Sequence, residues 1–248
     1  MSTVSKTGTL NLLPQDRTFY DLMWPYVIPY LIYVALSSMP ESLVSAELGQ
    51  IARLPATAAA MIYFGKVYRF GPLKPIHGVV SIVALPLALL SWIGPFYLLD
   101  SIGLTDVIVE DGGKKVSYLF FCLKIVNTVV LVAIFEELFM RVYVLGWFYQ
   151  AGSQRHEKGL LASIVATLDQ VPAALDRLPL SVFSVVGATI VFSAGHHAYE
   201  YLSAVCYFLF TTWLYHKSRS LWVCIFVHGL TNLSLVLLAV YGEMGWLW

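Results

Sequence analysis

Residues 118–141 form a run that is apolar and long enough for a membrane helix, yet it ends in two adjacent acids and an arginine. The run reads YLFFCLKIVNTVVLVAIFEELFMR, and its ionisable end consists of Glu136, Glu137 and Arg141. An ionisable group inside a membrane span is costly, and it is kept mostly where it pairs with another group or takes part in chemistry. The segment therefore predicts a membrane helix that carries a functional site.

Helical spacing gives the two acids different surroundings. Glu137 and Arg141 are four residues apart, so they share a face, with the acid on the favourable N-terminal side of the ion pair. Glu136 lies about 100° further round the helix and is left without this partner. We expect one carboxylate to be held in place and the other to be available.

With 58% hydrophobic and only 12% charged residues, the chain has the composition of a membrane protein rather than of a soluble domain. Its formal net charge is zero, which argues against a nucleic-acid partner because phosphate binding needs an excess of Lys and Arg. The three cysteines, Cys122, Cys206 and Cys224, lie in apolar runs without the spacing of a zinc site. We expect them to be small buried apolar side chains.

Apolar runs that could cross ~30 Å of hydrocarbon indicate seven spans, with a count of eight also open. These predicted spans are 24–39, 51–68, 78–98, 118–141, 181–197, 200–216 and 220–241. The sequence shows no internal repeat. We therefore expect an all-α, polytopic membrane helix bundle of about seven or eight transmembrane helices, folded as a single integral-membrane domain over residues 1–248.

Basic residues gather in alternate connections between the predicted spans, and such residues set the orientation of a membrane protein. They are Lys6, Arg17, Lys66, Arg69, Lys74, Arg155, Lys158, Arg177, Lys217 and Arg219. This pattern predicts a cytoplasmic N-terminus and a C-terminus on the other side of the membrane, which is the inner membrane if the chain is bacterial.

The longest polar interruption is the insert at residues 152–180. Between Leu160 and Leu175 apolar residues recur at helical spacing, which predicts an amphipathic helix on the cytoplasmic membrane surface. Such a helix either gates access to the site or simply connects two spans.

Two further polar clusters interrupt the apolar background. One is the segment FSAGH, residues 192–196, and the other is HGLTN, residues 228–232. The four-residue spacing of His228 and Asn232 places both side chains on one helix face. Because buried polar groups need partners, we expect both clusters to meet Glu136 in one cavity. The predicted catalytic core therefore spans residues 118–241.

These residue types fit the hydrolysis of a peptide bond. A carboxylate in a low-dielectric cavity holds a proton more tightly than in water, and it can act as the base that activates a water molecule. Histidine and asparagine donors opposite this base could hold a carbonyl group and stabilise the oxyanion that forms on attack. No serine or cysteine nucleophile is needed in this scheme.

Zinc is the alternative to this metal-free chemistry. Glu136 and two histidines could hold Zn²⁺ with water in the fourth position. The HExxH spacing that puts two ligands on one helical turn is missing, however. We expect no cofactor, and zinc stays open as the second reading.

The segments EELFMR (136–141), FSAGH (192–196) and HGLTN (228–232), in this order on successive predicted helices, resemble the three motifs of the CPBP family of intramembrane proteases. That family includes the type II CAAX prenyl endopeptidases, as well as bacterial members tied to bacteriocin self-immunity or to the processing of sorting tails. The resemblance covers roughly residues 118–241.

The resemblance implies a role for each motif residue. Glu136 would be the water-activating base, oriented by Glu137 with Arg141, and His196 would be the second catalytic group. His228 and Asn232 would form the oxyanion pocket, and Phe192 would line the site. The implied partners are the lipid bilayer and a membrane-associated or lipidated protein, which is cleaved near its hydrophobic or lipidated C-terminal segment.

Other classes remain open at this stage. The chain could be a non-enzymatic membrane scaffold or immunity protein, or a proton-coupled transporter that uses the same ionisable groups as a relay. A transporter should show inverted repeats or paired broken helices, and the sequence shows neither.

The predicted spans leave one geometric conflict. His228 lies roughly 12 Å inside the membrane at ~1.5 Å per residue, whereas His196 ends a helix that starts on the same side. The two can meet only if the helices between 181 and 216 are short, tilted or re-entrant, or if the helix from 118 continues toward Gln150. We expect no role for His197, and we expect Glu200 either to orient His196 or to lie in a solvated turn.

Overall fold

The computed structural model describes residues 23–40, 42–43, 45–105, 117–168, 180–242 and 244–247, except for the side chains of residues 46 and 47. The regular structure in these residues is helical and contains no strand. The helices are α1 (Trp24–Ser37), α2 (Ala46–Tyr63), α3 (Pro75–Ser101), a continuous helix from Tyr118 to Lys158, α7 (Leu160–Thr167), α8 (Val182–Ala194), α9 (Tyr201–Ser218) and α10 (Leu221–Tyr241). The predicted all-α bundle is confirmed.

The continuous helix, which we call the central helix, organises the bundle. Two π-helical segments, Val126–Val132 and Leu138–Val144, separate its α-helical parts α4 (Tyr118–Ile125), α5 (Ala133–Glu137) and α6 (Leu145–Lys158). The two acids of the first motif lie in the short α5 between the π segments. Such π segments occur often at functional sites, because they widen the helix and release carbonyl groups from the regular ladder.

The sequence pattern predicted that this helix ends at residue 141. In the structure the central helix runs on beyond that residue. It continues for more than four turns to Lys158, and Gly159 then ends it with a φ of 81°. Arg155 and Lys158 lie in the last turn, where positive charge is favourable next to the helix C-terminus. The apolar and aromatic residues after Arg141 allow this continuation, because they pack against neighbouring helices.

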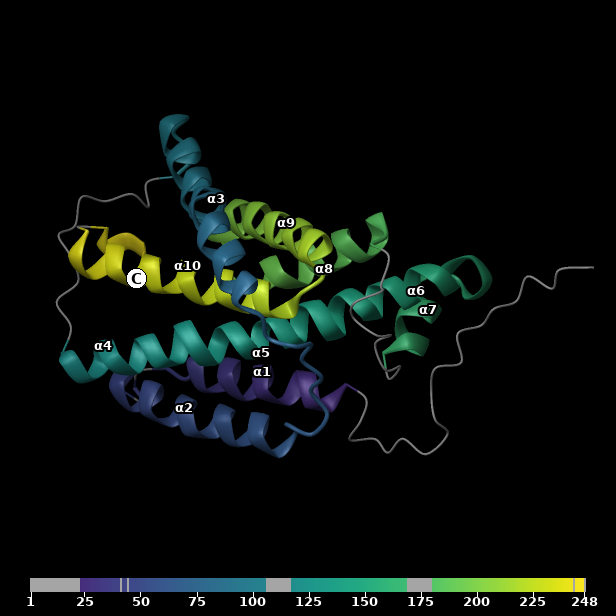
Figure 1. Cartoon of the computed structure of the whole chain (residues 1–248), viewed down its shortest axis with the longest axis horizontal. Coiled ribbons are helices and arrows are strands. Elements are labelled where there is room, and N and C mark those ends of the chain that lie inside the picture. Colours follow the sequence, from purple (N-terminus) through teal and green to yellow (C-terminus); the bar gives the residue numbers. More distant parts are fainter. Residues whose placement is uncertain are drawn as a thin grey trace, which may run out of the picture.

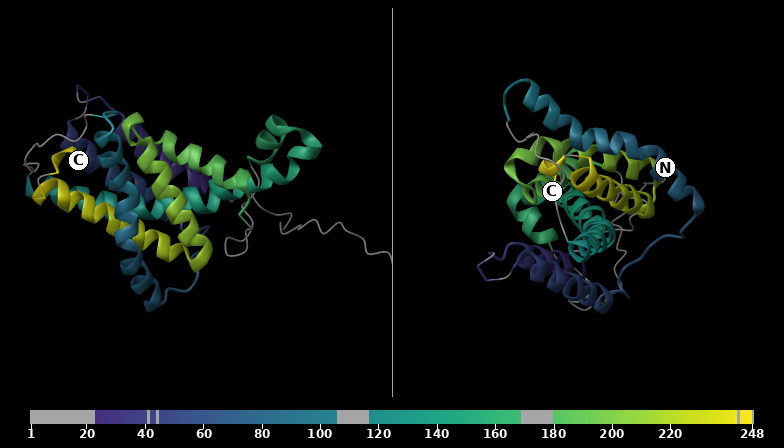
Figure 2. Two further views of the ribbon diagram at one scale, coloured as in Figure 1. Left: turned by 90° about the horizontal axis from the view of Figure 1, so that it is seen from above. Right: turned by 90° about the vertical axis from the view of Figure 1, so that its left-hand side faces the viewer.

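The other helices cover the central helix on two sides (Figure 1). α1 and α2 pack together and contact the central helix from one side, and α10 contacts its first π segment and α5 from the other. α3 and α9 pack next to α10, and α8 packs against α6 and α9. The end-on view in Figure 2 shows the central helix between these two layers.

Three helices are long and apolar enough to cross a membrane: α3, the central helix and α10. α1 and α8 are apolar but shorter. α2 begins earlier than the predicted span 51–68. It also ends earlier, because the chain turns at Phe64 and Gly65 before the polar connection to α3. The number of spans in the membrane and their orientation stay predictions.

The described residues of the insert 152–180 extend the central helix and then form α7. Residues up to Lys158 extend the central helix, and α7 then folds back on it, with the indole N–H of Trp147 donating to the Ile164 carbonyl at 3.0 Å. The helix predicted from Leu160 onward is present as far as Thr167. The part of the prediction that falls on 169–179 lies outside the described residues.

The predicted spans left open how His196 and His228 could lie at the same depth in the bundle. Both of the solutions that the sequence allowed are present. α8 is 13 residues long, or about 20 Å, and therefore ends before it could cross ~30 Å of hydrocarbon. The central helix also continues past Gln150, which places Glu136 well inside the bundle. His196, in the turn after α8, can thus reach the level of His228.

α10 approaches the first π segment of the central helix unusually closely. The Asn232 side chain donates to the Thr128 carbonyl at 2.8 Å. One turn earlier in α10, a Cβ on Gly229 would lie 2.6 Å from the Val129 carbonyl oxygen. Only a residue without a side chain fits at that point of contact.

The first prediction concerns this contact. In Gly229→Ala the new methyl group would push α10 away from a backbone atom that cannot move by itself, so we expect a loss of ~1–3 kcal/mol in the free energy of unfolding. Thermal unfolding of the detergent-solubilised protein measures it as a lower Tm. The matched control is Gly78→Ala in α3, where a Cβ meets nothing within 4 Å. An unchanged Tm for Gly229→Ala would contradict the close approach.

Candidate active site

The ion pair predicted from the spacing of Glu137 and Arg141 is present and fully buried. The Arg141 Nε donates to Glu137 Oε2 at 2.9 Å, and the two side chains are only 1% and 2% exposed. The two terminal nitrogens of Arg141 donate to the hydroxyls of Thr212 and Thr211 in α9, each at 2.6 Å. The Arg141 guanidinium also lies 4.1 Å from the centre of the Phe208 ring. Every part of this buried cation thus has a partner, which is the condition for its presence in an apolar bundle.

The second oxygen of Glu137 holds His228 rather than Glu136. Glu137 Oε1 lies 3.1 Å from His228 Nδ1, and the other ring nitrogen, Nε2, lies 3.8 Å from Glu136 Oε2. The 100° offset between adjacent helical residues turns Glu136 toward a cavity while Glu137 faces α10. Glu137 and Arg141 could therefore orient Glu136 only through His228, and this role stays a prediction.

These contacts fix the hydrogen on one nitrogen of His228. A carboxylate that is ion-paired with arginine can only accept a hydrogen bond, so the Nδ1 next to Glu137 must carry the hydrogen. Nε2 then faces Glu136, whose side chain is 20% exposed and makes no ion pair with arginine or lysine in the described part of the chain. One carboxylate is thus held in place and the other is available, as the sequence predicted.

His196 is held in the turn after α8. Its Nδ1 lies 2.9 Å from the Phe192 carbonyl oxygen, and its ring packs between Phe192 and Trp92, with centroid distances of 4.7 and 5.3 Å. Because a carbonyl only accepts, Nδ1 carries the hydrogen and Nε2 is left with its lone pair in the neutral ring.

The neighbouring His197 and Glu200 form the turn itself. The His197 backbone N–H donates to Glu200 Oε2 at 2.8 Å, and the exposed His197 ring stacks on Tyr199. Of the two expectations for Glu200, the turn is therefore confirmed, and no contact with the His196 ring is present.

Asn232 is anchored by its hydrogen bond to the Thr128 carbonyl. A side-chain amide has two N–H donors, so one hydrogen of Asn232 stays available after this bond. The carbonyl is in the first π segment, where the wider helix releases such groups for contacts with other helices. The π segment thus contributes to positioning a side chain of the third motif.

The three motifs meet around one cavity of about 130 Å³. Its walls are formed by Trp92, Val132, Glu136, Phe192, His196, Tyr207, His228, Thr231, Asn232 and Leu235. A cavity needs only ~10–15 Å³ to hold a water molecule, so this one has room for water next to a substrate group. The structure therefore brings together the four groups that the sequence placed around a reacting carbonyl, with Phe192 in the wall; the role of each in catalysis stays a prediction.

The sequence analysis missed two sets of residues at this site. Trp92 and Tyr207 line the cavity without any signal in the sequence, because aromatic side chains are common in every apolar helix of this chain. Thr211 and Thr212 were also missed, because two adjacent hydroxyls in an apolar span can bond to their own helix as well as to a neighbouring one.

The arrangement gives no geometric support to a metal centre. Among the residues that the structure describes, no group of three His, Cys, Asp or Glu side chains is placed to hold a metal ion. Glu136, His196 and His228 share a cavity wall, but they do not form such a group. The expectation that no cofactor is needed stays a prediction.

Residues 118–234 match the model of the Rce1-like type II CAAX prenyl endopeptidases. No curated protein and no solved structure matches the chain. The matched region begins where the central helix begins and ends just beyond Asn232, so it contains all three motifs. The resemblance inferred from these motifs is confirmed.

The second prediction concerns the buried ion pair. Arg141→Gln would leave Glu137 as an uncompensated charge, and we expect a loss of ~3–5 kcal/mol in the free energy of unfolding. Chemical denaturation in detergent measures this loss. Arg69→Gln, which removes an exposed arginine, is the control and should change stability by less than ~0.5 kcal/mol. Equal stabilities of the two variants would show that the ion pair does not hold the bundle together.

Proposed function

We propose that the chain is an intramembrane endopeptidase, because residues 118–234 match the model of the Rce1-like type II CAAX prenyl endopeptidase family. The family match and the three helices that are long and apolar enough to cross a membrane support an integral membrane protein with peptide hydrolase activity. We propose that it cleaves a membrane-associated protein near a hydrophobic or lipidated C-terminal segment. This cleavage would resemble the processing of CAAX boxes or of sorting tails. The observation that carries the proposal is the Glu136 carboxylate, which makes no arginine or lysine ion pair in the described residues and shares one cavity with His196, His228 and Asn232.

In the proposed reaction Glu136 acts on water. Its carboxylate accepts a proton from a water molecule, whose oxygen attacks the carbonyl carbon of the scissile peptide bond. The resulting tetrahedral intermediate collapses when the bond to nitrogen breaks and the protonated Glu136 returns the proton to the leaving amine. The proton that Glu136 removes is thus given back, and no covalent enzyme intermediate forms.

His228 is the proposed electrostatic partner of the oxyanion. With Nδ1 donating to Glu137, its Nε2 can donate toward the cavity only when the ring is protonated. In that state the positive charges of His228 and Arg141 balance the negative charges of Glu136 and Glu137. A buried group of four charges is then neutral as a whole, which supports an imidazolium donor that faces the cavity.

Asn232 is the proposed second oxyanion donor. Its contact with the Thr128 carbonyl fixes the orientation of the amide before substrate binds, and fixed donors stabilise a developing charge without reorganising. His196 is proposed to hold the attacking water from the other side, because its Nε2 can accept a hydrogen bond from that water in the neutral ring.

The non-enzymatic alternatives, a scaffold, an immunity protein or a proton-coupled transporter, have no observation in their favour. A structural ion pair inside a scaffold would be accounted for by the Glu137–Arg141 pair alone. Hydrolysis needs a second carboxylate that faces a cavity together with two histidines and an amide. A scaffold does not need this arrangement.

The third prediction tests the role of Glu136. Glu136→Gln removes the base and should lower the cleavage rate at least ~10²-fold. The melting temperature should stay close to that of the native chain, since Glu136 makes no arginine or lysine ion pair in the described residues. Mass spectrometry measures the cleavage of a prenylated C-terminal peptide and of a hydrophobic tail peptide in detergent micelles. Product formation at an undiminished rate would contradict the proposal.

The fourth prediction separates metal-free catalysis from zinc catalysis. Incubation with EDTA or 1,10-phenanthroline should leave the rate of the same cleavage reaction unchanged, because the proposed scheme uses only side chains of the chain. A loss of activity that added zinc restores would instead support Glu136, His196 and His228 as metal ligands. The chelator must be shown not to lower the Tm, so that unfolding is not mistaken for loss of a metal.

A further inference from the structure

A polar contact in the interior of the bundle joins α2 to the first π segment of the central helix. The Asn127 side chain donates to Gln50 Oε1 at 2.8 Å and to the Gln50 backbone carbonyl at 3.1 Å. Both residues are buried, and Asn127 is fully shielded from solvent. The two hydrogens of the Asn127 amide are thus both used on one residue of α2.

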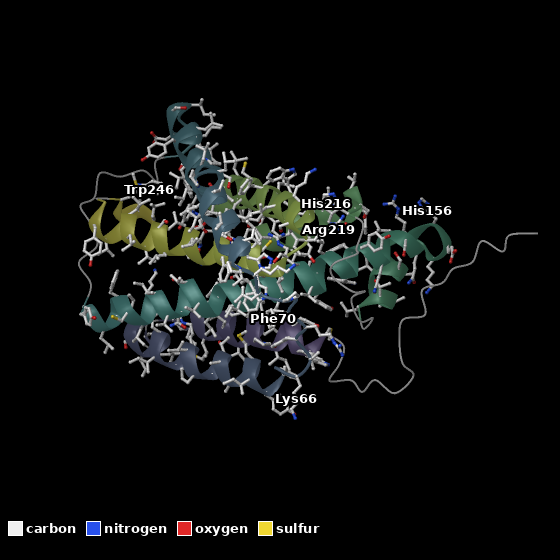
Figure 3. All side chains as sticks on the ribbon, in the orientation of Figure 1. Lys66, Phe70, His156, His216, Arg219 and Trp246 are labelled. Atoms are coloured by element: carbon white, nitrogen blue, oxygen red, sulfur yellow. The ribbon has the colours of Figure 1, made fainter. Side chains whose placement is uncertain are left out.

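Apolar packing between these two helices does not need this contact. Leu54 and Ala58 of α2 pack against a buried apolar cluster of the central helix that includes Leu131. Side chains, mostly of carbon atoms, lie between α2 and the central helix in Figure 3. The amide pair, by contrast, leaves Asn127 Oδ1 buried without a hydrogen-bond partner in the described residues. An unpaired buried acceptor lowers stability, whereas two apolar side chains of similar shape would not, so stability alone does not explain the pair.

The two residues after Asn127 contact α10 on the other side of the central helix. The Thr128 carbonyl accepts a hydrogen bond from the Asn232 side chain at 2.8 Å. The Val129 carbonyl oxygen lies 2.6 Å from the place where a Cβ on Gly229 would be. Figure 1 shows α2 and α10 on opposite sides of the central helix. Both helices therefore hold neighbouring residues of the same π segment.

A displacement of Asn127 would move the Thr128 carbonyl. The peptide unit between these two residues is planar and rigid, so few free rotations separate the anchored residue from that carbonyl. The Thr128 hydroxyl also donates to the Lys124 carbonyl at 2.8 Å, which restricts the freedom of Thr128 to adjust. Because a hydrogen bond weakens steeply when its angle is distorted, the Asn232 amide has to follow the Thr128 carbonyl.

The second hydrogen of the Asn232 amide is the one that the proposed reaction uses. Asn232 lines the catalytic cavity together with Glu136, and one of its hydrogens stays available after the bond to Thr128. The side-chain amide is planar, so the direction of the bonded hydrogen fixes the direction of the available one. A displaced Thr128 carbonyl would therefore turn the proposed oxyanion donor away from the group that it has to hold.

We infer that Gln50 and Asn127 are positioning residues for Asn232. Their contact holds the π segment between α2 and α10, and the Thr128 carbonyl then keeps the Asn232 amide in the direction that an oxyanion needs. Neither Gln50 nor Asn127 lines the catalytic cavity, and Gln50 lies outside the residues 118–234 that match the family model. The effect on cleavage rests on the proposed function, whereas the position of the Asn232 amide can be measured without any activity.

The first experiment follows the Asn232 amide by NMR of the full chain in detergent micelles. The chain has three asparagines, Asn11, Asn127 and Asn232, so a sample labelled with the NMR-active nitrogen isotope on asparagine gives three pairs of side-chain amide signals. The pair that disappears in Asn232→Ala is the pair of Asn232. We expect Gln50→Leu to shift this pair, because the π segment loses its side-chain contact with α2.

Ser81→Ala is the matched control for Gln50→Leu. The buried Ser81 hydroxyl of α3 lies 3.3 Å from the Val223 carbonyl of α10, so this variant removes a different interhelical contact of the same helix. It should leave the Asn232 signals in place. Unmoved Asn232 signals in Gln50→Leu, or an equal shift in both variants, overturn the inference.

Cleavage of the prenylated peptide and of the hydrophobic tail peptide tests the consequence for the reaction. Gln50→Leu should lower kcat about ten-fold or more, because a misplaced group acts poorly on the transition state. KM should change less than about two-fold, since Asn232 is proposed to bind the oxyanion rather than the substrate. Ser81→Ala should keep the kcat of the native chain. An unchanged kcat in Gln50→Leu overturns the inference.

A double variant separates positioning from a merely structural role. Gln50→Leu combined with Asn127→Leu replaces both partners with apolar side chains, which should bring the Tm back toward that of the native chain. We expect kcat to stay low, because nothing then fixes the π segment at its native position. A return of kcat together with the Tm would show a structural contact only and would overturn the inference.

The last comparison asks whether Gln50 acts through Asn232. In the Asn232→Ala background, Gln50→Leu should cause no further loss of kcat, since both changes remove the action of one amide. Losses that multiply independently overturn the inference. If the native chain cleaves neither peptide, the proposed function fails, and the NMR comparison then decides whether Gln50 positions Asn232.

Discussion

The buried pair of Glu137 and Arg141 is the interaction on which the rest of the site depends. Arg141 joins the central helix to α9 through Thr211 and Thr212, and Glu137 joins it to α10 through His228. Removal of either charge would leave the other unpaired in an apolar bundle. The same pair determines which nitrogen of His228 carries its hydrogen, and the occupation of Glu137 by these partners leaves Glu136 available. Stability and chemistry therefore share one network.

A second constraint is the width of the central helix. Its two π segments flank the pair of acids, and the first of them presents the Thr128 and Val129 carbonyls to α10. The Thr128 carbonyl accepts a hydrogen bond from the Asn232 side chain. Gly229 allows the backbones to approach closely enough for this contact. The close contact between α10 and the first π segment thus places a proposed oxyanion donor opposite the proposed base.

Part of this arrangement could be read from the sequence because it is local. The four-residue spacing gives the Glu137–Arg141 pair, apolar length gives α3 and α10, and buried polar side chains must converge on one another. Contacts between helices could not be predicted in detail, since they depend on rotation and tilt. The contact of Glu137 with His228 was therefore not predicted. Thr211 gave no clear signal either, because a threonine can satisfy its hydroxyl on its own helix, as this one also does at the Tyr207 carbonyl.

The account makes one central claim, that the groups around the small cavity hold a peptide carbonyl against the Glu136 carboxylate. A structure of the Glu136→Gln variant with an uncleaved tail peptide tests it most directly. The account predicts that the scissile carbonyl oxygen lies within hydrogen-bonding distance of His228 Nε2 and Asn232 Nδ2, with its carbon next to the side chain at position 136. A peptide bound elsewhere on the bundle, with these donors still turned away from it, would contradict the claim.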